Sequence, residues 1–189
     1  MLDRTSRPPL AAEVQRKRFG WRAAALLVAL VCSPLLGLPE DAEQPLVVDA
    51  DSGTYNDDPN GTIELSGNVQ IQQGTLRVEA ARVRATKREG KLNRVVATGA
   101  EGTPVRFRQR INAGEPFVRA HARTVDYSIA EEQIKLTGDA FLSTPEADYA
   151  GGTIIWDMKT NGVVCRDGCQ YERHPQPRAL PGASGPSPD

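Results

Sequence analysis

Apolar residues alternate with polar ones along most of this chain, and this alternation restricts its fold more than any other feature. Leu76 and Val78 flank Arg77, and Val105 and Phe107 stand among arginines in the same way. A period of two is typical of strands with one face against a core and the other in water. Residues that favour turns interrupt the alternation about every 8 to 12 residues, a spacing too short for helices between strands. The sequence therefore predicts an all-β fold of antiparallel strands.

Short segments rich in glycine, asparagine, aspartate or proline are the predicted turns. They are residues 57–61, 66–68, 73–74, 89–90, 99–102, 113–114, 138–139, 151–152 and 161–162. One segment, residues 75–92, also has the alanine, arginine and glutamate content of a helix. A strand over this segment requires a change of phase near residues 80–81, which a turn or bulge supplies.

The two ends of the chain differ from its middle. Residues 1–22 are basic and lead into the uncharged run 23–38, which is the pattern of a secretory signal peptide. The uncharged run is shorter than the roughly 20 residues that span a bilayer. We expect a signal peptide over residues 1–42, a folded domain over 43–170 and a disordered proline-rich tail over 171–189. The alternative is that residues 23–38 stay uncleaved as a membrane anchor.

A short motif occurs twice. L-S-G-N-V at residues 65–69 is matched 71 positions later by L-T-G-D-A at residues 136–140, which indicates a repeated supersecondary unit. Together with residues 44–51, 63–74 and 80–83, these motifs resemble the OstA-like domain family of lipopolysaccharide-transport proteins. The resemblance covers about residues 44–164. The long basic N-terminal region, the cysteine pair near residue 167 and the proline tail depart from the family pattern.

This resemblance implies an open, twisted β-jellyroll in which two antiparallel sheets face each other. It implies a periplasmic protein that holds the acyl chains of lipopolysaccharide in an apolar slot and carries the lipid from the inner to the outer membrane. Its copies would stack head to tail. Domains of the same fold would connect them to the inner-membrane extraction complex and the outer-membrane translocon. The alternative is an inner-membrane-anchored component of the same pathway, and no cofactor is implied.

The inward phase of the predicted strands supplies the candidate lipid-binding residues. They are Leu46, Val48, Ile63, Leu65, Val69, Ile71, Val83, Val105, Phe107, Val125, Tyr127, Ile129, Ile134, Leu136, Leu142 and Trp156, with Ile154 in the same phase. The same alternation arises in a closed sandwich whose inward side chains only pack together as a core. The resemblance favours the slot most for Leu46, Val48, Phe107, Tyr127 and Ile129.

Charge changes sign along the chain, although the formal net charge is only −1. Residues 43–76 carry six acidic and no basic side chains, residues 77–123 carry twelve basic and four acidic, and residues 124–189 carry five basic and ten acidic. The basic middle fits three interpretations: contact with a phosphorylated headgroup, contact with an acidic end of the next copy, or a solvated outer face. The balanced total gives no sign of a nucleic-acid binder.

Two cysteines, Cys165 and Cys169, lie four positions apart near the end of the predicted domain. In an oxidising compartment we expect a small-loop disulfide, with free thiols as the alternative. Zinc is disfavoured because a C-x3-C pair with the distant His174, or with Asp167, is a weak metal pattern. The chain also lacks G-x-S-x-G, H-E-x-x-H and phosphate-loop motifs, so an enzyme is not expected.

Overall fold

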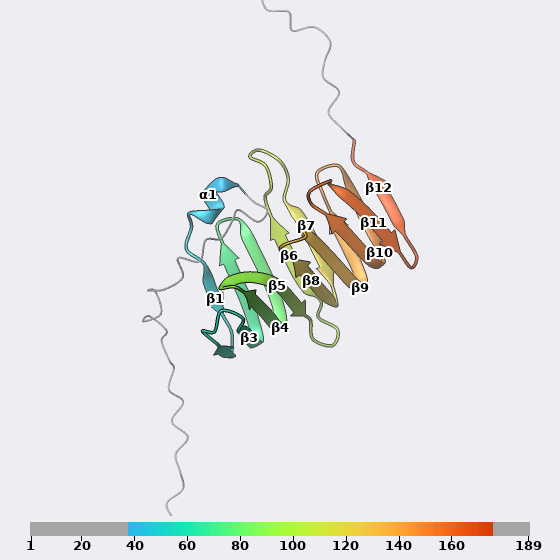
Figure 1. Ribbon diagram of the computed structural model, residues 1–189. Helices are drawn as coiled ribbons and strands as arrows, with labels where there is room; N and C mark the ends of the chain where they lie inside the picture. Colours follow the sequence, from blue (N-terminus) through green and yellow to red (C-terminus); the bar gives the residue numbers. More distant parts are fainter. Residues whose placement is uncertain (1–37, 176–189) are drawn as a thin grey trace, which may run out of the picture. The chain divides into compact units, whose positions relative to one another are not determined.

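A computed structural model describes residues 38–175, and strands dominate them (Figure 1). The elements are α1 (Pro39–Ala42), β1 (Val47–Asp49), β2 (Ser52–Tyr55), β3 (Thr62–Gln73), β4 (Leu76–Arg88), β5 (Lys91–Thr98), β6 (Val105–Gln109), β7 (Val118–Ala122), β8 (Thr124–Ser128), β9 (Gln133–Ser143), β10 (Ala147–Asp157), β11 (Gly162–Arg166) and β12 (Gln170–Arg173). All pairings between strands are antiparallel, so the predicted all-β fold is confirmed.

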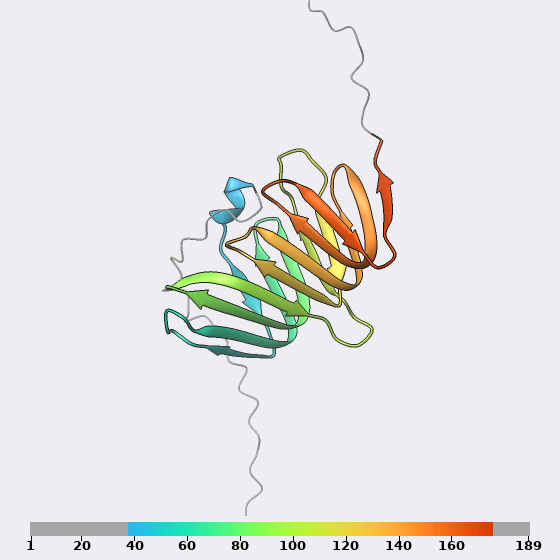
Figure 2. The ribbon, with the colours of Figure 1, turned by 45° about the vertical axis from the view of Figure 1, so that its right-hand side comes forward.

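Four long strands, β3, β4, β9 and β10, each bend and take part in two half-sheets (Figure 2). Half-sheet A contains β1, β6, β7 and β12, paired to one half of each long strand. Half-sheet B contains β2, β5, β8 and β11, paired to the other halves. This is the β-jellyroll arrangement that the family resemblance implies.

The bends lie at the repeated motif. Gly67 and Asn68 in β3 together oppose one residue of β4, and Gly138 and Asp139 in β9 oppose one residue of β10. All four residues have positive φ, between 46° and 82°. Glycine adopts this conformation without strain, and asparagine and aspartate tolerate it better than other residues do. The motif therefore marks β-bulges at which a strand passes from one half-sheet to the other.

Three of the predicted turns are wrong for this reason. Residues 66–68, 138–139 and 151–152 lie inside β3, β9 and β10 rather than between strands. Glycine-rich pairs mark both hairpin turns and mid-strand bulges, so local sequence does not distinguish the two. Residues 75–92 contain β4 and not a helix, and the predicted phase change near residues 80–81 is confirmed by the shift in register there.

The strand order repeats itself in two halves of the chain. β1 to β6 form a first repeat and β7 to β12 a second, with corresponding pairings and bulges 71 positions apart. The N–H of Asp51 donates to the carbonyl of Gly67, and the N–H of Arg123 donates to that of Gly138. The repeats join through β5 with β8 and β6 with β7. In Figure 1 the first strands therefore lie at one end and β12 at the other.

Side chains from both half-sheets meet in two apolar clusters, so the half-sheets face each other. The smaller cluster contains Val69 and Val105 from half-sheet A with Val83 and Ala97 from half-sheet B. The larger one draws on β7, β9 and β10, and Leu136 at its centre is fully buried. Two of the fully buried members, Val69 and Leu136, lie within two residues of a bulge.

The ordered fold extends past both expected boundaries of the 43–170 domain. Asp41 in α1 is buried and accepts hydrogen bonds from the N–H and the hydroxyl of Thr75, at the β3–β4 turn. At the other end, β12 reaches Arg173, and His174 contacts Pro145 and Asp148. Residues 1–37 of the expected signal peptide, with nearly all of the uncharged run 23–38, and residues 176–189 of the expected tail lie outside the described residues.

Candidate functional site

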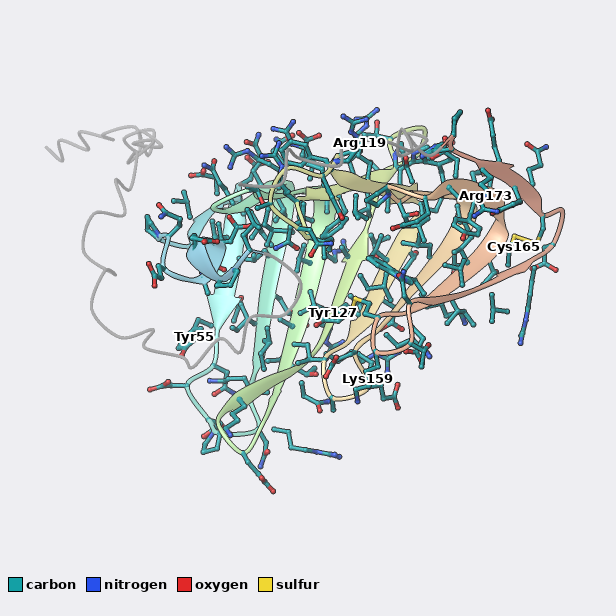
Figure 3. The ribbon with its side chains drawn as sticks, turned by 90° about the horizontal axis from the view of Figure 1, so that it is seen from above. Tyr55, Arg119, Tyr127, Lys159, Cys165 and Arg173 are labelled. Atoms are coloured by element: carbon teal, nitrogen blue, oxygen red, sulfur yellow. A yellow bond between two sulfur atoms is a disulfide. The ribbon has the colours of Figure 1, made fainter. Side chains whose placement is uncertain are left out.

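The candidate lipid-binding residues fall into three groups by position. Buried members of the clusters are Val69, Val83, Val105, Ile134, Leu136, Leu142, Ile154 and Trp156. Partly exposed members are Ile63, Leu65, Ile71, Phe107, Val125, Tyr127 and Ile129. Val48 in β1 is exposed, and so is Leu46, which precedes this strand. In Figure 3, Tyr127 lies among the strands, whereas Arg119 projects outward.

The partly exposed group forms an apolar inner face. Leu65, Ile71, Val78 and Val95 pack on the smaller cluster, and Val125 contacts both clusters. This face presents aliphatic and aromatic carbon that is not fully covered by protein, which suits a flexible hydrocarbon chain. The second repeat is more completely filled: Trp156 is 5% exposed there, and its indole N–H donates to Asn161.

The large apolar side chains that are exposed in residues 38–175 gather at the two ends of the fold. They are Leu46, Val47, Val48, Tyr55, Val164 and Tyr171, on or beside β1, β2, β11 and β12. These four strands are the outermost ones of the two half-sheets, and each has one edge that no other strand of residues 38–175 pairs with. Figure 3 shows Tyr55 and Arg173 at opposite ends. Unpaired strand edges with apolar side chains are favourable sites for the addition of another strand.

A disulfide joins Cys165 and Cys169 across the corner between β11 and β12, with Cα atoms 5.7 Å apart. A Cβ at Gly151 would stand 2.7 Å from the sulfur of Cys165, so the adjoining strand needs a glycine at this position. The N–H of Gly152 donates to the carbonyl of Asp167 in the same corner. The cross-link therefore holds the two short strands of the C-terminal edge at their bend.

His174 holds the far end of β12. One ring nitrogen contacts the carbonyl oxygen of Pro145 at 3.2 Å, and the other lies 3.1 Å from a carboxylate oxygen of Asp148. Two acceptors on one ring favour the doubly protonated imidazolium. The Pro145 carbonyl, followed by Asp148, therefore raises the pKa of His174 above its ordinary value.

This contact makes the stability of the edge depend on pH. A raised pKa in the folded state means that protonated His174 stabilises the fold fully below about pH 6.5, and that this contribution is lost as pH rises through the folded-state pKa. We expect His174→Gln to lower the melting temperature at pH 5 and to leave it unchanged at pH 9. Thermal unfolding of both proteins across this range measures the difference, and a gap that does not change with pH would contradict the assignment.

The outer faces of the two half-sheets differ in their ion pairs. On half-sheet B, Arg94 makes two contacts with Asp126, one of them 2.7 Å long, and these contacts raise the pKa of Arg94. Arg84 lies 3.4 Å from Glu64 on the same face. On half-sheet A, burial and then the charge of Arg106 lower the pKa of His121, whose ring stacks on Phe141.

A protein-family profile described as "LptA/(LptD N-terminal domain) LPS transport protein" matches residues 47–162, more than half of the chain. The chain belongs to this family. The match begins at the first residue of β1 and ends at the first residue of β11, so the LptA/LptD N-terminal domain family shares nearly the whole set of strands.

Named members of the family cover most of the chain. The lipopolysaccharide export system protein LptA of Escherichia coli K12 is 30% identical over 137 residues, 72% of this chain and 71% of LptA. The LptA of Haemophilus influenzae is 30% identical over 70% of this chain and 76% of its own length. The crystal structure of LptH, a periplasmic LptA homologue from Pseudomonas aeruginosa, matches with a TM-score of 0.59 at 22% identity, covering 74% of this chain and all of that one.

Within residues 38–175, no group of three or more histidine, cysteine or acidic side chains is placed to hold a metal ion. No helix in this range is long and apolar enough to cross a membrane.

The sequence did not single out Val47, Tyr55, Val164 or Tyr171 as functional residues. Their signal was available in part, since the adjacent apolar residues Val47 and Val48 break the alternation at the start of the domain.

Proposed function

We propose that this protein carries lipopolysaccharide through the periplasm, with the acyl chains against the inner apolar face and with copies joined head to tail. Membership of the LptA/LptD N-terminal domain family supports the transport role. The partly exposed inner face around Ile71, Phe107 and Tyr127 supports the acyl-chain site. At the two ends of such an assembly, same-fold domains of the inner-membrane extraction complex and the outer-membrane translocon would pair with the free edges.

The observation that carries head-to-tail joining is the repeat inside the chain. The junction between β5 and β8, and between β6 and β7, already pairs a C-terminal edge with an N-terminal edge. In the second repeat, β11 and β12 correspond to β5 and β6 of the first repeat. In the first repeat, β2 and β1 correspond to β8 and β7 of the second. Two copies can therefore meet with the geometry that the chain uses internally.

This equivalence gives a register for the contact between copies. Val163 in β11 would lie opposite Tyr55 in β2, just as Val95 lies opposite Tyr127 inside the chain. Tyr171 in β12 would lie opposite Val48 in β1. The pairing would cover Tyr171, Val48 and Tyr55, which are among the most exposed apolar side chains of the described residues.

A photo-crosslinking probe tests the acyl-chain site. Val95 and Val96 are adjacent in β5, but Val95 packs on the inner cluster, whereas Val96 lies in register with Arg84 and Asp126 on the outer face. We expect a probe at Val95 or Tyr127 to capture lipopolysaccharide in cells, and a probe at Val96 to capture little or none. Equal capture at Val95 and Val96 would remove the inner face as the binding site.

A further inference from the structure

Three arginines stand side by side on the outer face of half-sheet A. Arg77 of β4 lies opposite Arg108 of β6, and Arg108 lies opposite Arg119 of β7. Like charges directly opposite each other on neighbouring strands destabilise a sheet. The described part of the chain supplies no salt bridge to any of the three, so the fold carries this repulsion uncompensated.

Further cations surround this arginine row, which we define as Arg77, Arg108 and Arg119. Arg110 lies 4.7 Å from the ring centre of Phe117, and Arg108 lies 5.6 Å from the same ring. Arg106 has Glu79 at 4.0 Å, the limit of an ion pair. On half-sheet B, in contrast, Arg84 and Arg94 each have a close carboxylate. The arginine row thus differs from these two arginines in having no ion pair within the described residues.

Some guanidinium nitrogens on this face are buried from water and have no hydrogen-bond acceptor within the described residues. Nη1 of Arg77 and Nε of Arg110 are buried, and no hydrogen bond to them is present within residues 38–175. A buried donor without a partner costs about 1–3 kcal/mol, and more when the group is charged. Beside Arg77 and Arg108 there is a hollow of about 240 Å³, whose other polar lining residues are Asp49, Gln70, Gln72 and Glu79. Two neighbouring arginines of this face therefore line one hollow.

The row is close to the rim of half-sheet A. The backbone N–H of Arg110 donates to the hydroxyl of Thr75, which ties the end of β6 to the β3–β4 turn. Phe107 and Val78, the inward neighbours of Arg108 and Arg77, pair with each other on the opposite side of the same strands. A lipid whose chains lay on the inner face would bring its headgroup out at this rim.

We propose that the arginine row is a binding site for the phosphate groups of the lipid headgroup, an inference that rests on the proposed function. Guanidinium groups bind phosphate through paired, charge-assisted hydrogen bonds, and three of them side by side match two phosphates on one headgroup. Bound phosphate would relieve the repulsion along the row.

A second copy of the chain is a poorer fit to the row. The acidic side chains Asp49, Asp148 and Glu172 are on the same half-sheet as the row, close to its two outer edges. A copy added at either edge would continue the half-sheet beside the row rather than cover it. The proposed head-to-tail contact therefore leaves the arginine row open for a ligand.

A comparison of the affinities for two lipids distinguishes the contribution of the headgroup phosphates from that of the acyl chains. Lipid A with two phosphates and monophosphoryl lipid A would be titrated against the mature protein and against the double variant Arg108→Gln/Arg119→Gln. Arg82→Gln/Arg84→Gln, both in β4 on half-sheet B, is the control with the same loss of charge. We expect the unmodified protein and the control to prefer the doubly phosphorylated lipid by about tenfold, as one charge-assisted contact implies. The row variant should bind both lipids alike.

Each remaining outcome counts against the row. Equal affinity of the unmodified protein for the two lipids would overturn it while leaving the inner face as the acyl-chain site. An equal loss of this preference in the control variant would mean that general positive charge, rather than the row, attracts the lipid. Fewer oligomers in sedimentation of the row variant alone would assign the row to contact between copies. If neither lipid binds and the Val95 probe captures nothing, the proposed function and this inference both fail.

The row variant should melt no lower than the unmodified protein, because it loses a repulsion.

Discussion

Replacing Leu136 by alanine should lower the free energy of unfolding by about 2–5 kcal/mol, the range for a leucine deleted from a close-packed core. Leu136 is 0% exposed and lies between Val125 of β8 and Ile154 of β10 in the pairing register. A typical domain has only about 5–15 kcal/mol of net stability, so the variant would be close to the threshold of folding.

Chemical denaturation measures this loss in the free energy of unfolding, and the dependence on denaturant concentration should be the same for both proteins. Leu46→Ala is the matched control because Leu46 is 52% exposed at the free edge and contributes little to the core. Equal destabilisation by the two variants would mean that Leu136 belongs to an open surface rather than to the packed interior. The comparison thus separates the side chains that support the inner face from those free to contact a ligand.

Replacing Val48 by lysine should abolish head-to-tail assembly while leaving the fold intact. In the proposed register Val48 would be covered by Tyr171 of the next copy, which is 63% exposed when alone. A lysine there would have to bury its charge in an apolar contact next to Arg173, and edge lysines are a general means of preventing strand addition. We expect only monomers at concentrations where the unmodified protein forms oligomers.

Sedimentation or light scattering over a concentration series gives the readout. Val96→Lys makes the same chemical change in β5, a strand paired on both sides, and should leave assembly unchanged. Oligomers that persist in Val48→Lys would show that copies meet through some surface other than the β1 and β2 edge.

The alternation of residues was sufficient to predict the strands, because a period of two depends only on which face of each strand is wet. Ile71, Phe107 and Tyr127 were placed correctly on the inward side in this way. The alternation was not sufficient to predict how the strands divide between half-sheets. That division depends on β-bulges such as Gly67-Asn68, whose residues also suit an ordinary turn.

The same limit explains which functional candidates were missed. An arginine row requires that Arg77, Arg108 and Arg119 be in register, and register is fixed by pairing between segments far apart in the sequence. The edge residues Tyr55 and Tyr171 look like ordinary strand residues until it is known that no further strand in the described part of the chain covers them. The sequence also gave no means of separating core from accessible lining, since Leu136 and Tyr127 share one phase.

The internal repeat bears on how a lipid would move along an assembly of copies. If each junction between copies reproduces the junction within a copy, an acyl chain would cross from one molecule to the next on the backbone arrangement that it also meets inside one molecule. Its free energy would then vary with a period of one protein length, without a barrier peculiar to the boundary between molecules. Such a path has no built-in direction. Net flow would be decided by how fast lipid is supplied at one end and withdrawn at the other.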